Sequence, residues 1–254
     1  MTLFDAIILG IIQGITEFLP ISSSGHLVLG QALMGVNSPG NVVEVVTHLG
    51  TLLSVIWVFW KDLSSILISL QNKDTQKYIL FLIMGTLPAV IIGLAARDMI
   101  TDLFDSIPIV AGSLIFTGII LLLTQKLNRN NKQLNLKKGL LIGLTQAFAM
   151  MPGISRSGMT ISTGLALGLS GKDAAKFSFL LAIPVIAGAG LLTALDTQQG
   201  SISIPRLQLL LAFFSAFIVG TISLKWLLGL LESGKFHRFG YYCIMVGLIT
   251  YLAI

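Results

Sequence analysis

The chain has 254 residues, of which 54% are hydrophobic and only 11% are charged, and its formal net charge is +5. Soluble domains carry about 25% charged residues, so this composition excludes a water-soluble globular protein and indicates that lipid surrounds most of the surface. We therefore expect no nucleic-acid partner, and interpret the basic balance as a signal of membrane topology.

The first segment, residues 2–35, is apolar but is broken in the middle by Pro20 and the run Ser22-Ser23-Ser24-Gly25. It lacks the basic flank of a signal peptide, because the only early charge is Asp5. Neither half reaches the roughly 20 residues that a helix needs to cross a bilayer. We expect two half-helices that enter and leave on the same side, with the broken backbone lining protein or a watery cavity.

Six later runs are apolar and long enough to span a bilayer: 41–60, 78–97, 108–126, 176–195, 207–230 and 238–254. A second broken segment, residues 137–169, lies between the third and fourth runs. It is interrupted by Pro152-Gly153 and by Ser155-Arg156-Ser157-Gly158. Each broken segment is thus followed by three predicted spans.

The two broken segments align without gaps at an offset of 133 residues, which pairs Gly10 with Gly143, Gln13 with Gln146, Ser22 with Ser155, Ser24 with Ser157 and Gly25 with Gly158. Three spans is an odd number, so the second repeat starts on the opposite side of the membrane. We predict an all-α polytopic membrane protein with one integral membrane domain over residues 1–254. It comprises two inverted repeats, 1–126 and 134–254, each with a re-entrant half-helix pair and three transmembrane helices, giving six spans and four half-helices that meet near the midplane.

The basic residues test this topology. Arg97 and Arg206 fall on the side of the N-terminus, whereas twelve fall on the other: Lys61, Lys73, Lys77, Lys126, Arg129, Lys132, Lys137, Lys138, Lys172, Lys176, Lys235 and Arg238. The positive-inside bias makes the second side cytoplasmic. Both termini and the first break are then expected to face outward. Lys225 lies near the cytoplasmic end of its span, where snorkelling explains it.

Ionisable residues within apolar segments are costly and indicate functional sites. Glu17, three serines and His26 lie together at the first break, and Arg156 lies at the second. If the breaks meet, Arg156 and the N-termini of the second half-helices favour an anion, and phosphate fits best. A serine is then a candidate nucleophile, His26 a candidate acid or base, and Glu17 a candidate ligand for Mg²⁺.

Structural interpretations of the same residues remain open. The serines at the first break could act only as helix caps, His26 could be a satisfied buried histidine, and Arg156 could simply pair with Glu17. Glu44 and His48 lie one helical turn apart. They could line the same cavity or hydrogen-bond each other.

The motifs Gln13-Gly-Ile-Thr-Glu17-Phe-Leu-Pro-Ile-Ser22-Ser-Ser-Gly-His26 and Pro152-Gly-Ile-Ser155-Arg156-Ser157-Gly-Met-Thr160 resemble those of the bacterial undecaprenyl-diphosphate phosphatases, the bacitracin-resistance family. The resemblance covers nearly the whole chain. It implies a plasma-membrane enzyme that hydrolyses the polyprenyl diphosphate lipid to the monophosphate, recycles the carrier for peptidoglycan, confers bacitracin resistance and works at the outer face. It also implies a divalent cation, Mg²⁺ or Ca²⁺.

Carried over residue by residue, the resemblance makes Glu17 the acidic and metal-binding residue, Ser23 the nucleophile, His26 the motif histidine and Arg156 the phosphate-binding residue. Substrate contacts are expected from the motif neighbours Gln13, Ser22, Ser24, Ser155, Ser157 and Thr160. Many members carry a glutamate where this chain has Gln13, which puts in doubt a mechanism that needs two carboxylates.

Two questions stay open at this stage. Broken helices and inverted repeats are also typical of transporters, so lipid-phosphate transport is the rival function; the Ser23 and His26 pair beside Arg156 favours hydrolysis. Attack by water in place of Ser23 is the rival mechanism. The sequence leaves open whether the chain works alone or as a homodimer.

Overall fold

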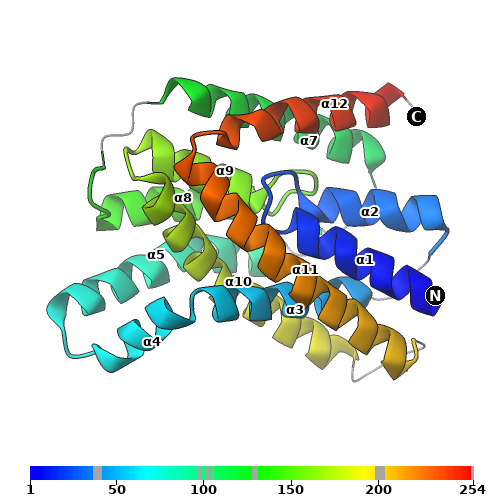
Figure 1. Ribbon diagram of the computed structural model, residues 1–254, viewed down its shortest axis with the longest axis horizontal. Helices are drawn as coiled ribbons and strands as arrows, with labels where there is room; N and C mark the ends of the chain where they lie inside the picture. Colours follow the sequence, from blue (N-terminus) through cyan, green and yellow to red (C-terminus); the bar gives the residue numbers. More distant parts are fainter. Residues whose placement is uncertain are drawn as a thin grey trace.

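The computed structural model describes residues 1–36, 42–96, 99–100, 103, 106–127, 131–197 and 204–252, with backbone only for 193–197. Within these ranges the chain is mostly helical and has no strand (Figure 1). Arg97 and Arg129, which the topology prediction used, lie outside the described residues.

The first apolar segment folds as two short helices, α1 (Leu3–Thr16) and α2 (Ser23–Met34), separated by residues 17–22. They have 14 and 12 residues, so neither is long enough to cross a bilayer. The Thr2 hydroxyl caps α1 in a capping box with Asp5. The two helices pack against each other, which confirms the predicted break.

The second broken segment behaves in the same way. Helix α8 (Leu136–Phe148) and helix α9 (Arg156–Ala166) are separated by residues 149–155 and pack together. The side chain of Asn135 caps α8 and that of Ser155 caps α9. Each break thus lies where proline, glycine and serine interrupt the apolar pattern.

The six predicted spans all fold as helix, and they differ in length. They are α3 (Val42–Val58) with α4 (Trp60–Ile68), α5 (Lys73–Ala95), α7 (Ile107–Leu123) with η2 (Thr124–Lys126), α10 (Gly171–Thr197), α11 (Arg206–Glu232), and α12 (Phe239–Leu252), which follows η3 (Phe236–Arg238). In the described part of the chain, α5, α7 with η2, α10 and α11 are long and apolar enough to span; α3 with α4 gives a fifth if this bent pair is one span.

The first expected span differs most from the prediction. Helix α3 ends at Val58 and the chain turns by 67° into α4, whose residues Lys61 to Ile68 had been expected in a loop. The last expected span is also short, since α12 has 14 residues. Apolar composition predicted helix correctly, but it could not reveal a bend at Phe59 between two apolar stretches.

Close backbone contacts hold the helices together. Helix α1 packs on α11, α11 on α3, α8 on α5, and α7 on α12. A Cβ atom at Gly10 would collide with the backbone of Ala212, and one at Gly143 with that of Gly85. Small residues permit this approach in membrane proteins, where packing replaces the hydrophobic effect between helices.

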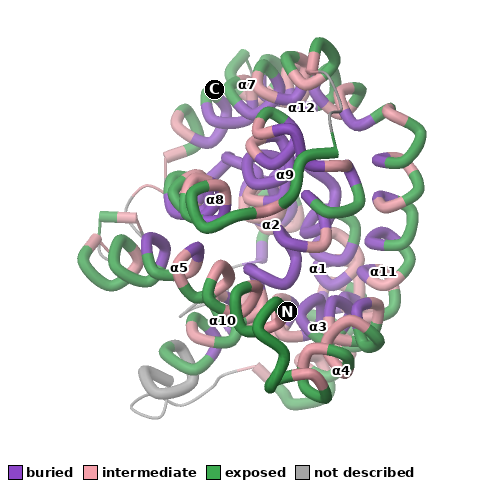
Figure 2. The backbone as a smooth tube through the Cα atoms, turned by 90° about the vertical axis from the view of Figure 1, so that its left-hand side faces the viewer, coloured by how far each residue is buried: buried purple, intermediate pink, exposed green. Residues whose placement is uncertain are grey.

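Burial is concentrated in the interior around α1, α2, α3 and α9, while long faces of α5 and α11 are exposed (Figure 2). Large apolar side chains are exposed on these and other helices, among them Trp57 of α3, Ile91 of α5, Ile218 and Ile222 of α11, and Leu252 of α12. A soluble monomer rarely exposes so much contiguous apolar surface. The molecule is therefore shaped for lipid contact.

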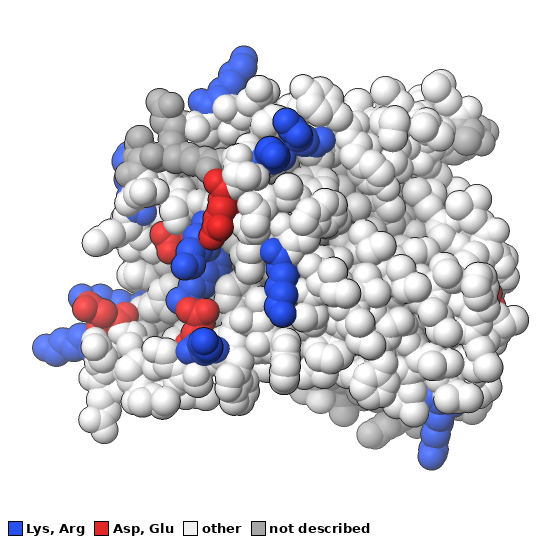
Figure 3. All heavy atoms as spheres, in the orientation of Figure 1, with Lys and Arg blue, Asp and Glu red and all other residues white. Residues whose placement is uncertain are grey.

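Charge is unevenly distributed along the molecule. Both termini lie at the right-hand end of Figure 1, and in the same orientation most visible Lys and Arg side chains gather towards the left (Figure 3). The right-hand half of this face is almost free of charge (Figure 3).

Candidate active site

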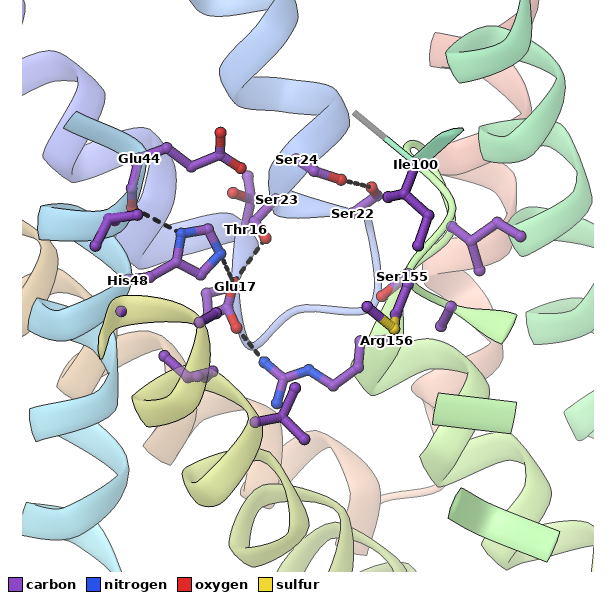
Figure 4. A pocket seen from close by; sticks show the side chains of 18 residues that line it. Thr16, Glu17, Ser22, Ser23, Ser24, Glu44, His48, Ile100, Ser155 and Arg156 are labelled. Carbon is purple, nitrogen blue, oxygen red and sulfur yellow. Dashed lines mark hydrogen bonds and ion pairs between the residues drawn. The ribbon is translucent and has the colours of Figure 1, made fainter. Parts of the chain in front are cut away.

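A cavity of about 320 Å³ lies where the two helix breaks meet (Figure 4). Its polar wall comes from the first break, the second break and α3. The lining residues are Thr16, Glu17, Ser22, Ser23, Ser24, Glu44, Val45, His48, Ile100, Ala149, Met150, Ile154, Ser155, Arg156, Val185, Ile186, Ala189 and Gly190. The structure thus brings together Glu17, Ser22, Ser23, Ser24, Ser155 and Arg156 of the predicted site.

Glu17 is the centre of the polar network. It directly follows α1 and is 5% exposed. The Ser23 hydroxyl donates to Glu17 Oε2 at 2.6 Å, and Gln13 Nε2 donates to the same oxygen at 3.0 Å. The Arg156 guanidinium forms an ion pair with Glu17 Oε1. A buried carboxylate requires such partners, and here one partner is the predicted nucleophile.

The pairing of Arg156 with Glu17 was one of the structural alternatives, and it is present. It does not occupy the whole guanidinium, which has five N–H donors in a planar fork. Arg156 also lines the cavity, so donors remain available to an anion there. The ion pair and phosphate binding are compatible.

His48 forms a second contact with Glu17. Its Nδ1 lies 2.8 Å from the carbonyl oxygen of Glu44, which can only accept, so Nδ1 carries a proton. Its Nε2 then faces Glu17 Oε2 at 3.4 Å. The imidazole of His48 thus lies beside the Glu17 carboxylate, on the same oxygen that accepts from Ser23.

Glu44 and His48 both line the cavity, as one of the two open interpretations expected. The hydrogen bond between them also exists, but it runs to the main-chain carbonyl of Glu44. The Glu44 carboxyl group is left facing the cavity with Glu17 (Figure 4).

Two helix N-termini point at this cavity. Ser22 caps α2 by accepting from Gly25 N at 3.4 Å, and Ser155 caps α9 by accepting from Gly158 N at 3.1 Å. Ser23 and Arg156 are therefore the first residues of their helices. Unpaired N–H groups and the positive helix end favour an anion at both positions. Of the three serines at the first break, Ser22 has the capping role, and this role coexists with its place in the cavity wall.

The apolar residues of the first break fix its position. Phe18 is fully buried and meets Phe179 of α10 edge to face, with ring centroids 5.6 Å apart. Leu19 and Ile21 belong to the same core cluster. Because Phe18 is anchored in this core, the adjacent Glu17 carboxylate has little freedom to move.

The chain matches the family described as bacitracin resistance protein BacA over residues 6–249. It belongs to this family. Curated relatives named undecaprenyl-diphosphatase include those of Parabacteroides distasonis (38% identity, covering 98% of this chain and 97% of the relative), Halothermothrix orenii (40%, 98% and 97%) and Desulforapulum autotrophicum (39%, 100% and 99%). The resemblance stated from the two motifs is confirmed.

Four predicted site residues of this BacA-family chain do not line the cavity: Gln13, His26, Ser157 and Thr160. Gln13 donates a hydrogen bond to Glu17 but lies outside the cavity wall. Ser157 bonds to the Ser155 hydroxyl at 3.2 Å, and Thr160 to the Arg156 carbonyl at 2.8 Å. These three residues hold neighbours that do face the cavity, and their predicted substrate contacts stay predictions.

His26 faces away from Ser23. Its Nδ1 donates to the Ser22 carbonyl at 2.8 Å, and its Nε2 accepts from the Tyr242 hydroxyl at 2.9 Å. The two rings are stacked, with centroids 5.7 Å apart. Both ring nitrogens are thus satisfied, which matches the satisfied-histidine alternative; the acid or base role of His26 stays a prediction.

A divalent cation has suitable oxygen donors here. Among the described residues, no group of three His, Cys, Asp or Glu side chains converges as a metal site. The carboxylates of Glu17 and Glu44 nevertheless both face the cavity beside serine hydroxyls. Mg²⁺ commonly takes one or two carboxylates and completes its shell with water and substrate oxygens, so the donor set fits such an ion.

Two contacts had no signal in the sequence. His48 was noticed for its spacing from Glu44, but nothing linked it to Glu17. Tyr242 lies 216 residues from its partner His26 and was not singled out. Both contacts arise from packing between segments that are distant along the chain.

Proposed function

We propose that the protein hydrolyses undecaprenyl diphosphate to undecaprenyl phosphate and inorganic phosphate, which recycles the lipid carrier for peptidoglycan synthesis and confers bacitracin resistance. The observation that carries this proposal is the 2.6 Å hydrogen bond from the Ser23 hydroxyl to buried Glu17, beside Arg156. A binding site alone does not need a serine aligned on a carboxylate. The names of the relatives support the same reaction.

The first step is transfer of the terminal phosphoryl group to Ser23. Arg156 and the N-termini of α2 and α9 hold the phosphate oxygens. Glu17 accepts the proton of Ser23 as its oxygen attacks the terminal phosphorus. The bond from this phosphorus to the bridging oxygen breaks, and the electron pair leaves with undecaprenyl phosphate.

The second step is hydrolysis of the phosphoserine. Glu17 first gives the proton that it took from Ser23 to the departing undecaprenyl phosphate. Water then attacks the phosphorus, its proton passes to Glu17, and the bond between Ser23 Oγ and phosphorus breaks. Ser23 recovers that proton from Glu17, and inorganic phosphate leaves. Direct attack by water on the diphosphate, with Glu17 as base, is the alternative that a Ser23 variant distinguishes.

Glu17 and Glu44 would hold the divalent cation. When bound, the cation would offset the negative charge of the diphosphate and its leaving group. Many relatives would have a second carboxylate at the position of Gln13 in α1. In this chain Glu44 of α3 would provide the second carboxylate instead. This assignment explains how a chain with glutamine in the first motif retains two acidic groups at the site.

The proposal includes the inverted repeats, 1–126 and 134–254, with six spans and four half-helices. Equivalent helices have equivalent partners: α1 packs on α11 as α8 packs on α5, and α1 pairs with α2 as α8 pairs with α9. Helices α3 and α10, and α7 and α12, contact each other across the centre. In the plasma membrane, the basic end would face the cytoplasm, and both termini and the active site the outer side (Figures 1 and 3).

The test is phosphate release from undecaprenyl diphosphate by the purified protein in detergent, with and without EDTA. Arg156→Ala is compared with Arg206→Ala, a basic residue at the exposed start of α11. We expect release that needs a divalent cation and falls at least about a hundredfold in Arg156→Ala, while Arg206→Ala stays near wild type. A folded wild type that releases no phosphate with any cation contradicts the proposal and favours lipid-phosphate transport.

A further inference from the structure

We propose that a groove between α11 and α12 binds the phosphate headgroup of an anionic membrane lipid, at the basic end of the molecule and on the other face of the first helix break from the active site. The groove encloses about 480 Å³. It is lined by Ile15, Leu19, Ile21, Trp226, Leu230, Lys235, Arg238, Phe239 and Tyr242, and it shares no residue with the catalytic cavity.

The groove has an apolar wall and two basic residues. Seven of the nine side chains are apolar or aromatic, and the other two are Lys235 and Arg238 at the turn between the helices. Both basic residues are exposed, and neither forms an ion pair within the described part of the chain. None of the described residues that line the groove is acidic. Two unpaired cations at the mouth of an apolar groove complement a negative headgroup with an attached hydrocarbon chain.

The size and surroundings of the groove favour a lipid over a soluble anion. A free phosphate would fill a small part of about 480 Å³ and would leave the apolar wall without a partner. Small-molecule pockets typically enclose about 300–1,000 Å³, so this one takes a headgroup with the start of its chains. The outer faces of α11 and α12 are exposed and apolar, so the rest of the lipid stays in the bilayer.

The floor of the groove connects it to the catalytic site. Leu19 and Ile21 line the groove and belong to the same break as Glu17 and Ser22, which line the catalytic cavity. Tyr242 lines the groove and donates to His26, which in turn donates to the Ser22 carbonyl. A lipid in the groove therefore packs against the hydrogen-bonded chain that supports the backbone of Ser22. This inference does not depend on the hydrolase activity.

Trp226 provides a direct reporter, because it lines the groove and is one of only three tryptophans. The full-length protein carrying Trp57→Phe and Trp60→Phe is reconstituted into mixed vesicles of phosphatidylglycerol and phosphatidylcholine. Either one lipid or the other is brominated, and quenching of Trp226 fluorescence gives their relative affinity for the groove. We expect phosphatidylglycerol to be preferred by roughly fivefold for each basic residue that contacts it.

The decisive variants are Lys235→Gln with Arg238→Gln in this background. They should remove the preference for phosphatidylglycerol while quenching by total brominated lipid remains. Lys61→Gln with Lys73→Gln is the matched control, because it removes the same charge from exposed residues of α4 and α5, and it should keep the preference. Equal quenching by both lipids in the parent protein, or a preference that survives loss of Lys235 and Arg238, would overturn the proposal.

Discussion

The two helix breaks have similar local structure but carry different chemistry. Each ends one short helix and begins another at a capping serine, Ser22 or Ser155. The residue after the cap is Ser23 in the first break and Arg156 in the second. In the proposed mechanism, the first break supplies the nucleophile with its carboxylate, and the second supplies a cation for phosphate. If the two breaks are copies within an inverted repeat, this mechanism divides one reaction between them.

The breaks also differ in backbone strain. Ser22 has φ 68° and Gly153 has φ 85°, so both lie in the left-handed region. Gly153 adopts this conformation at little cost because it is a glycine. A Cβ atom at position 153 would collide with Val110. A serine at positive φ is strained, and such strain is characteristic of functional sites. The first break, which is proposed to supply the nucleophile Ser23, is thus the one with a strained backbone.

The largest effect is expected from Ser23→Ala. If the first break supplies the nucleophile, kcat should fall about a thousandfold or more with little change in KM, and the radiolabelled phosphoenzyme that wild type forms on acid quenching should disappear. Near-normal turnover would contradict the covalent step.

The control for that experiment is Ser155→Ala in the second break. It removes the hydroxyl that caps α9, the equivalent of Ser22 and not of Ser23, and so removes no proposed nucleophile. It should cost about 1 kcal/mol of stability and retain a labelled phosphoenzyme. A loss of the phosphoenzyme in Ser155→Ala would show that the chemistry is not divided as proposed.

Arg156→Lys tests the second break. Lysine retains the charge but not the planar fork of donors, so kcat/KM should fall by about 10- to 100-fold, mainly through KM. Steady-state phosphate release measures both parameters, and Arg206→Lys serves as the unaffected comparison. A change confined to kcat would indicate that Arg156 acts on the transition state alone.

Thermal unfolding in detergent tests the difference in strain. Gly153→Ala should lower stability by about 1–3 kcal/mol, because alanine is disfavoured at positive φ and meets Val110. Ser22→Gly should cost no more than a few tenths of a kcal/mol, since glycine is an adequate cap and relieves the strain. If both variants were destabilised equally, the backbone at Ser22 would be no more strained than the backbone at Gly153.

The smallest effect is expected from Tyr242→Phe. It removes one hydrogen bond to His26 and leaves the stacked ring, so kcat should fall by about two- to tenfold. Tyr241→Phe, at the neighbouring exposed position, is the control and should have no effect. If both variants have the same turnover, the hydrogen bond from Tyr242 to His26 does not help to position the Ser22 backbone.

The sequence predicted those features that depend on local chemistry. Proline, glycine and serine marked both breaks, and the scarcity of charge marked Glu17 and Arg156 as functional. The family motifs then predicted that Ser23 belongs with them, and the structure brings the three side chains together.

Features that depend on tertiary contacts were not predictable in this way. The bend between α3 and α4 follows from packing at Phe59, which is buried in the core and lies against Phe179. His26 was grouped with Ser23 by proximity, but its ring is held by Tyr242 from the far end of the chain. Sequence distance says little about which partner satisfies an imidazole.

The ion pair between Glu17 and Arg156 has a consequence for biogenesis. The two residues are 139 positions apart, so Glu17 is synthesised long before its partner. Until Arg156 arrives, the first re-entrant pair would bury a carboxylate without its cation, which is unfavourable in lipid. We therefore expect the first half of the chain to reach its final depth only after the second half is inserted, so that this one ion pair couples the placement of the two halves.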